Sequence, residues 1–157
     1  MTIKRSLEVP LFCLGLLVAL MGAARPAHAV LGEPADSIAS DRKAMAALRS
    51  ATTVRNGYTV EEVVSQSTTV REYIAPSGIV FGIAWNGLVH PDLSMLLGSY
   101  SGEYQKALQQ PRIPGQRYRR VKANGVVVEK WGHMRNLRGR AYAPALIPQG
   151  VNVDDIK

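Results

Sequence analysis

The residues best suited to chemistry in this sequence are the basic side chains of its second half. Between positions 103 and 140 the chain has ten Lys and Arg residues and two acids, Glu103 and Glu129. Guanidinium groups hold phosphate and carboxylate groups through paired hydrogen bonds, so this segment predicts a surface that binds an anionic partner. A solvated basic face without a ligand is the alternative interpretation. The candidate binding residues are Arg117, Arg119, Arg120, Lys122, Lys130, Arg135, Arg138 and Arg140.

A second chemistry is suggested by His90, which lies between a strand pattern and a helix pattern. A histidine can act as a general base when folding brings it within hydrogen-bonding reach of its partners. The carboxylates that could complete such a site are Asp92, Glu72 and Glu103. The simpler interpretation is that Pro91 begins a helix and that Asp92 lies at the positive end of that helix.

No catalytic residue, metal ligand or cofactor is assigned from the remaining patterns. Residues 98–102 have the spacing of a nucleophile elbow, but Tyr100 occupies the middle position, where that chemistry needs Ser. The sequence has one cysteine, Cys13, and its histidines beyond residue 29 are His90 and His133. So few thiol and imidazole groups leave little material for a metal site. The absence of a recognisable catalytic set favours a protein that is not an enzyme.

The first 29 residues are typical of a secretory signal peptide. Lys4 and Arg5 precede an apolar run at 11–24, and the small-residue pattern Ala-His-Ala follows at 27–29. The run of 14 residues is shorter than the roughly 20 that a membrane-spanning helix needs. We expect cleavage after Ala29 and a periplasmic or secreted product with no transmembrane segment.

The remaining residues, 30–157, are expected to form one cysteine-free domain. The whole chain has 19 basic and 12 acidic residues, of which three bases and one acid fall in the leader, leaving a net charge of +5. In an exported protein the anionic partners available are lipid headgroups, saccharide phosphates and cell-wall polymers, and nucleic acid is not expected. Another envelope protein is the alternative partner.

The first half of this domain predicts a helix followed by an antiparallel meander. Residues 36–50 have apolar positions at helical spacing. Three strands follow at 58–64, 69–74 and 79–85, where β-branched and aromatic residues are frequent, and a tight turn at 75–78 joins the last two. In the third strand Ile79, Phe81, Ile83 and Trp85 fall on one face, which we expect to be the core side.

The second half predicts a helix and a hairpin. A helical pattern begins at Pro91 and continues to Tyr104, and residues 109–115 are expected to form an exposed connector. Asn124 and Gly125 supply the positive backbone angles of a two-residue turn. Counting outward from that turn pairs Val121 with Val128, Arg120 with Glu129, Arg119 with Lys130 and Tyr118 with Trp131.

The fold class predicted from these elements is a single α+β domain. A last strand at 137–143 would return beside 126–133, and residues 144–157 are expected to be an irregular tail. The antiparallel sheet would then have about five to six strands, with two helices on one of its faces.

Residues 70–87, together with Pro91-Asp92-Leu93 and the segment 96–100, resemble the DUF2844 family of exported proteobacterial proteins, a domain of unknown function. The resemblance extends from about Leu31 to the second hairpin. It implies a small exported bacterial domain. It carries no known catalytic or ligand-binding residue, so none is transferred to this chain.

The sequence therefore favours an exported periplasmic or envelope protein that acts as a non-enzymatic binding module through its basic surface. A small periplasmic hydrolase that uses His90 and nearby carboxylates is the alternative. A purely structural or assembly role is a third interpretation.

Overall fold

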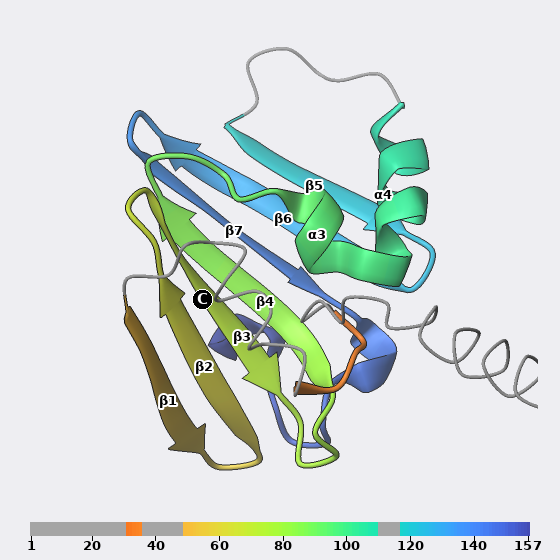
Figure 1. Ribbon diagram of the computed structural model, residues 1–157. Helices are drawn as coiled ribbons and strands as arrows, with labels where there is room; N and C mark the ends of the chain where they lie inside the picture. The colour runs from red at the N-terminus through yellow and green to blue at the C-terminus, as the bar shows by residue number, and fades with distance from the viewer. Residues whose placement is uncertain (1–30, 36–48, 110–116) are drawn as a thin grey trace, which may run out of the picture.

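Within the residues that the structure describes, seven antiparallel strands form one sheet in the computed structural model (Figure 1). The order across the sheet is β1-β2-β3-β4-β7-β6-β5, so β4 and β7 join two meanders at the centre. The strands are β1 (Arg49–Arg55), β2 (Tyr58–Val64), β3 (Thr68–Ile74), β4 (Val80–Gly87), β5 (Tyr118–Ala123), β6 (Val126–His133) and β7 (Asn136–Tyr142).

The described residues are 31–35, 49–109 and 117–157. The predicted leader, most of the predicted helix at 36–50 and most of the predicted connector at 109–115 lie outside them. Within the described residues no helix has both the length and the apolar character needed to cross a membrane.

The predicted Asn-Gly hairpin is confirmed, including its register. Of the two turn residues only Gly125 has a positive φ, of 77°, so the prediction of positive angles at both Asn124 and Gly125 is wrong for Asn124. Val121 lies opposite Val128, as predicted. The other three predicted pairs, from Arg120–Glu129 outward, are also present. β7 pairs with β6 on the other side, as predicted for the returning strand.

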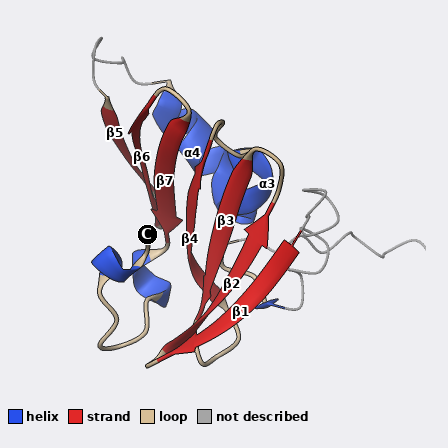
Figure 2. Ribbon diagram, turned by 90° about the vertical axis from the view of Figure 1, so that its left-hand side faces the viewer, coloured by secondary structure: helices blue, strands red, loops and turns tan. Residues whose placement is uncertain are grey.

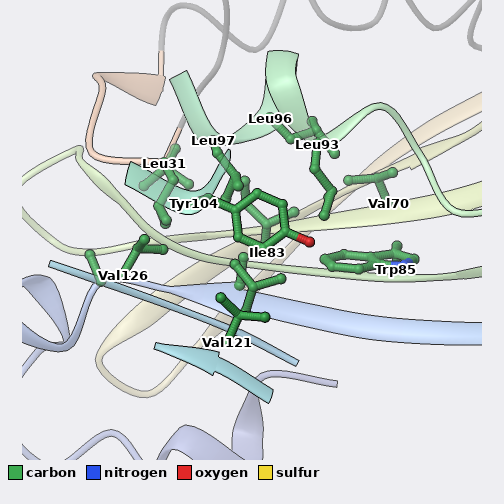
Figure 3. Packing of buried hydrophobic residues seen from close by; sticks show 14 of the residues in the cluster. Leu31, Val70, Ile83, Trp85, Leu93, Leu96, Leu97, Tyr104, Val121 and Val126 are labelled. Carbon is green, nitrogen blue, oxygen red and sulfur yellow. The ribbon is translucent and has the colours of Figure 1, made fainter. Parts of the chain in front are cut away.

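One helical stretch covers one face of the sheet. It consists of α3 (Leu93–Leu97), a 3-10 turn at Gly98–Tyr100 and α4 (Ser101–Leu108). The side chain of Asp92 caps the first turn by accepting a hydrogen bond of 2.9 Å from the Ser94 amide, the helix-end role expected for this residue. Figure 3 shows the core beneath these helices, in which the buried apolar residues include Leu93, Leu97, Tyr104, Val70, Ile83, Trp85, Val121 and Val126.

The opposite face is partly covered by the C-terminal tail, and we call it the tail face. Two 3-10 turns, Pro144–Leu146 and Val153–Asp155, lie on this side of the sheet (Figure 2). Ile156 is fully buried against a second apolar cluster that contains Tyr73, Phe81 and Tyr142. Both faces of the sheet therefore carry a core, which explains why its central strands are apolar on both sides.

Three expectations about the fold need correction. The sheet has seven strands within the described residues, more than the five to six predicted, and β1 was missed because its polar sequence lacks an alternating apolar pattern. The predicted helix at 36–50 is wrong at its end, since Arg49 and Ser50 belong to β1. The described part of the chain thus holds one helical stretch and is mostly β, where two helices were expected.

The predicted core face of β4 is also wrong in part. A β-bulge between Tyr73 and Ile74 shifts the register with β4. Phe81 consequently packs with Tyr73 in the tail-face cluster, while Ile83 and Trp85 belong to the helix-face cluster. A strict alternation of sides cannot be read through a bulge, because the extra residue reverses the side on which the following side chains lie.

Replacing Gly139 of β7 by alanine tests the close packing at the centre of the sheet. The added methyl group would overlap the indole of Trp85 and the carbonyl oxygen of Glu129. We expect Gly139→Ala to lower the free energy of unfolding in urea by about 1–3 kcal/mol. Gly102→Ala in α4 is the control, because no atom lies within 4 Å of the place that its new methyl group would take, and its stability should be unchanged or raised. Equal stability of both variants would contradict the packing described.

Candidate anion-binding face

A buried carboxylate organises the tail face of strands β5, β6 and β7. Glu129 accepts a hydrogen bond of 2.5 Å from Nε of Arg140 and one of 2.9 Å from the hydroxyl of Tyr118. Nε of Arg120 lies 3.1 Å from Oε1 of the same carboxylate. One acidic side chain in β6 therefore binds residues from both neighbouring strands.

Arg140 extends this cluster to the C-terminal tail. Its Nη1 donates hydrogen bonds to the carbonyl oxygen of Val153 at 2.8 Å and to that of Ile156 at 3.4 Å. It also lies 3.3 Å from Oδ1 of Asp154. These contacts hold the tail against the sheet at the point where Ile156 enters the core.

The ionisation of Glu129 reflects these contacts. Burial alone would raise the pKa of its carboxyl, but the hydrogen bonds from Arg140 and Tyr118 and the charges of Arg140 and Arg120 outweigh it, so the pKa is lowered. Two predicted binding residues, Arg120 and Arg140, thus share an ionic partner within the fold, and the side chain of Arg120 is still 44% exposed.

The other predicted binding residues do not form one surface. Arg119 and Lys130 face each other on the helix side, where Nζ of Lys130 lies 5.6 Å from the centre of the Tyr104 ring. Lys122 is on the tail side near the β5–β6 turn, and Arg135 lies in the turn between β6 and β7. Arg117 and Arg138 remain, and the structure brings these two together.

Described residues form hollows along the tail face, and one of them is lined by both Arg117 and Arg138. The first, of about 420 Å³, lies over β1–β3, and its charged lining residues are Arg55, Glu62, Arg71, Asp155 and Lys157. The second, of about 260 Å³, is lined by Arg71, Trp85, Asn86, Trp131, Arg138, Gly139 and Lys157. The third, of about 510 Å³, is lined by Arg117, Tyr118, Trp131, Gly132, His133, Asn136 and Arg138.

The second and third hollows share Trp131 and Arg138, and we call them together the arginine hollow. Among the described residues that line it there are four Lys and Arg side chains and no Asp or Glu. Nε of Arg138 donates to Asn136 Oδ1 at 3.1 Å, which orients the guanidinium group. Within the described part of the chain neither Arg117 nor Arg138 forms an ion pair, so both can bind an external anion.

Sequence reasoning did not identify Arg71, Asn86, Trp131 and Lys157 as parts of this site. The pairing of Tyr118 with Trp131 was predicted from the hairpin, and these two aromatic side chains now lie beside the arginines. Asn86 and Arg71 belong to the first meander and reach the site because β4 pairs with β7. That pairing joins segments far apart in the chain, and no local pattern in the sequence encodes it.

His90 has a partner within the core. The indole nitrogen of Trp85 donates a hydrogen bond of 2.9 Å to Nδ1 of His90. Burial, and then the charge of Lys130, lower the pKa of this histidine, which keeps the acceptor nitrogen unprotonated. Asp92 caps α3, and Glu103 pairs with Lys106. The hydrogen bonds of His90, Asp92 and Glu103 therefore do not assemble a general-base site.

Comparison with known families identifies a match over most of the chain. The model of a family described as "Protein of unknown function (DUF2844)" matches residues 27–156. No curated protein and no solved structure matches the chain.

Replacing Glu129 by glutamine tests whether this carboxylate stabilises the tail face. Glu129→Gln leaves Arg140 without its charged acceptor, and we expect the free energy of unfolding at neutral pH to fall by about 2 kcal/mol. Because the pKa is lowered in the folded state, this stabilisation is present above the ordinary pKa of glutamate and is lost as pH falls through the lowered value. Urea unfolding across the acid range should therefore show a shallower loss of stability in the variant than in the wild type.

The matched control is Glu103→Gln, which removes an exposed pair with Lys106 in α4. Its stability should change by less than about 0.5 kcal/mol. A similar loss in both variants would mean that Glu129 has no special role.

Proposed function

Because the chain belongs to the DUF2844 family, whose function is unknown, we propose a function from its geometry: an exported, non-enzymatic module that binds an anionic component of the cell envelope. The observation that carries this proposal is the arginine hollow, whose described lining residues are rich in basic, aromatic and amide side chains and include no Asp or Glu.

The proposed binding mode follows from which arginine side chains already have an ionic partner within the fold. Glu129 is the ionic partner of both Arg140 and Arg120, Asp154 also contacts Arg140, and Glu62 contacts Arg71 at 2.9 Å. Arg138 keeps its terminal N–H groups for a ligand. A guanidinium group can donate two parallel hydrogen bonds to a phosphate or carboxylate, so Arg138 favours a ligand that carries such a group.

The aromatic side chains add a second requirement on the ligand. Trp131 is half-buried and Tyr118 is exposed, and both line the hollow beside Arg138. Such side chains offer flat apolar surface together with a polar edge. A ligand that combines an anionic group with apolar or ring-shaped parts would use both, whereas an inorganic ion would use the arginines alone.

Export is supported by the leader pattern at residues 1–29. An exported protein meets anionic lipid headgroups, saccharide phosphates and cell-wall polymers. These are the envelope components whose chemistry matches the hollow.

Arg138→Gln should weaken anion binding. We expect isothermal titration with short-chain inorganic polyphosphate to show salt-sensitive binding to the wild type and about tenfold weaker binding to the variant, since a hydrogen bond to a charged group is lost. Arg119→Gln removes the same charge on the helix side and should have a much smaller effect. Binding that is insensitive to salt, or an equal loss in both variants, would overturn the proposed site.

The export part of the proposal has a separate test. When the full chain is expressed in a Gram-negative host with its own leader, mass spectrometry of the periplasmic fraction should find a product that begins at Val30. Retention of residues 1–29, or a product confined to the cytoplasm, would contradict export without bearing on the anion site.

A further inference from the structure

Large apolar side chains are exposed at one end of the sheet. Leu88 and Val89 follow β4 and are 52% and 50% exposed, and Met134 in the β6–β7 turn is 81% exposed. Gly87 pairs with Leu137, the residue next to Asn136, which closes the turn that contains Met134. The loop after β4 and the β6–β7 turn therefore lie at the same end of the sheet, as Figure 1 shows.

The loop at 88–90 holds its apolar side chains in solvent although its backbone is fixed. The amide of Leu88 donates to the carbonyl oxygen of Ser67 at 2.7 Å, and the hydroxyl of Thr68 donates to the carbonyl oxygen of Val89 at 2.9 Å. The hydrogen bond between Trp85 and His90 anchors its other end. These hydrogen bonds hold the backbone in a position that leaves the side chains of Leu88 and Val89 exposed to solvent.

The β6–β7 turn is built in the same way. His133 pairs with Asn136, so Met134 and Arg135 are the two turn residues, and their φ angles are 24° and 57°. Turns of this type usually contain Asn-Gly, because residues with a Cβ are disfavoured at positive φ. A strained turn that presents methionine to solvent points to a use for that side chain.

Basic residues lie beside Met134 at this end of the sheet. Arg135 is in the turn itself, and Arg117 and Arg138 line the adjoining hollow, which Asn136 and His133 also border. The described residues that line this hollow include no acid. Apolar tips flanked by arginines match the surface of an anionic bilayer, where side chains enter the headgroup layer and cations meet the phosphates.

We infer that this end of the sheet, with Leu88, Val89 and Met134 at its tip and Arg117, Arg135 and Arg138 beside them, binds the surface of an anionic lipid bilayer. The inference rests on the proposed function and names the anionic component as a lipid headgroup. Exposed aliphatic side chains favour lipid over a soluble saccharide or a free phosphate, because those ligands give such side chains nothing apolar to contact.

The test is co-sedimentation of the protein, without residues 1–29, with two kinds of vesicle. One contains equal parts of phosphatidylglycerol and phosphatidylcholine, and the other contains phosphatidylcholine alone. We expect the wild type to bind the anionic vesicles at least about tenfold more tightly than the neutral ones, and to be released as salt is raised.

Met134→Asn is the informative variant, since asparagine suits a positive φ and should keep the turn folded while removing the apolar tip. Its binding to anionic vesicles should fall at least about fivefold, with circular dichroism unchanged. Val54→Asn is the control, because Val54 is 79% exposed but lies in β1 near the opposite end of the sheet (Figure 1). The control should bind vesicles like the wild type.

Polyphosphate binding separates this inference from the proposed function. A protein that binds polyphosphate but not anionic vesicles would overturn the bilayer inference and leave the anion site intact, and equal vesicle binding by Met134→Asn and the wild type would also overturn it. If the wild type binds neither polyphosphate nor anionic vesicles, both proposals are overturned.

Discussion

The buried carboxylate of Glu129 is the contact on which the second half of the structure depends. It binds side chains from β5 and β7 at once, and through Arg140 it fixes the C-terminal tail whose Ile156 fills the tail-face core. Burying a charge is unfavourable unless it is paired and hydrogen-bonded, and here the guanidinium groups and a tyrosine hydroxyl meet that condition. With this acid committed to Arg120 and Arg140, the neighbouring Arg138 is left without an ionic partner inside the described fold.

One face of the sheet forms the main core and the other presents the proposed binding site, because the two faces are covered differently. Helices α3 and α4 cover the apolar residues of one face, whereas the tail covers part of the other (Figure 2). The uncovered part of the tail face contains the arginine hollow, which continues into the exposed apolar tip at one end of the sheet. Strands β6 and β7 position Trp131 and Arg138, and hydrogen bonds fix the backbone of the loop that carries Leu88 and Val89. Both lower the conformational cost of binding compared with a site on a flexible loop.

The sequence could predict those features whose cause is local. Asn124-Gly125 determines a turn type, and a turn type determines register, so the contacts of Arg120 with Glu129 and of Tyr118 with Trp131 followed by counting. The pairing of β4 with β7, the bulge that redirects Phe81 and the burial of Ile156 depend on segments distant in sequence. Arg138 and Arg117 were predicted as site residues from the basic segment alone. The order of the strands was needed to show that they lie apart from Arg119 and Lys130. It was also needed to show that Arg71 and Asn86 belong to the site.

The central claim is that the arginine hollow is a site for an anionic ligand. Amide chemical shifts of the isotope-labelled protein, followed while a soluble short-chain phosphatidylglycerol is added below its critical micelle concentration, test it most directly. The account predicts saturable shifts at Trp131, Arg138 and Tyr118, with the indole signal of Trp131 moving and the amides of α4 unchanged. Shifts spread evenly over all basic regions, including Arg119 and Lys130 on the helix side, or no saturable shift at the hollow, would contradict it.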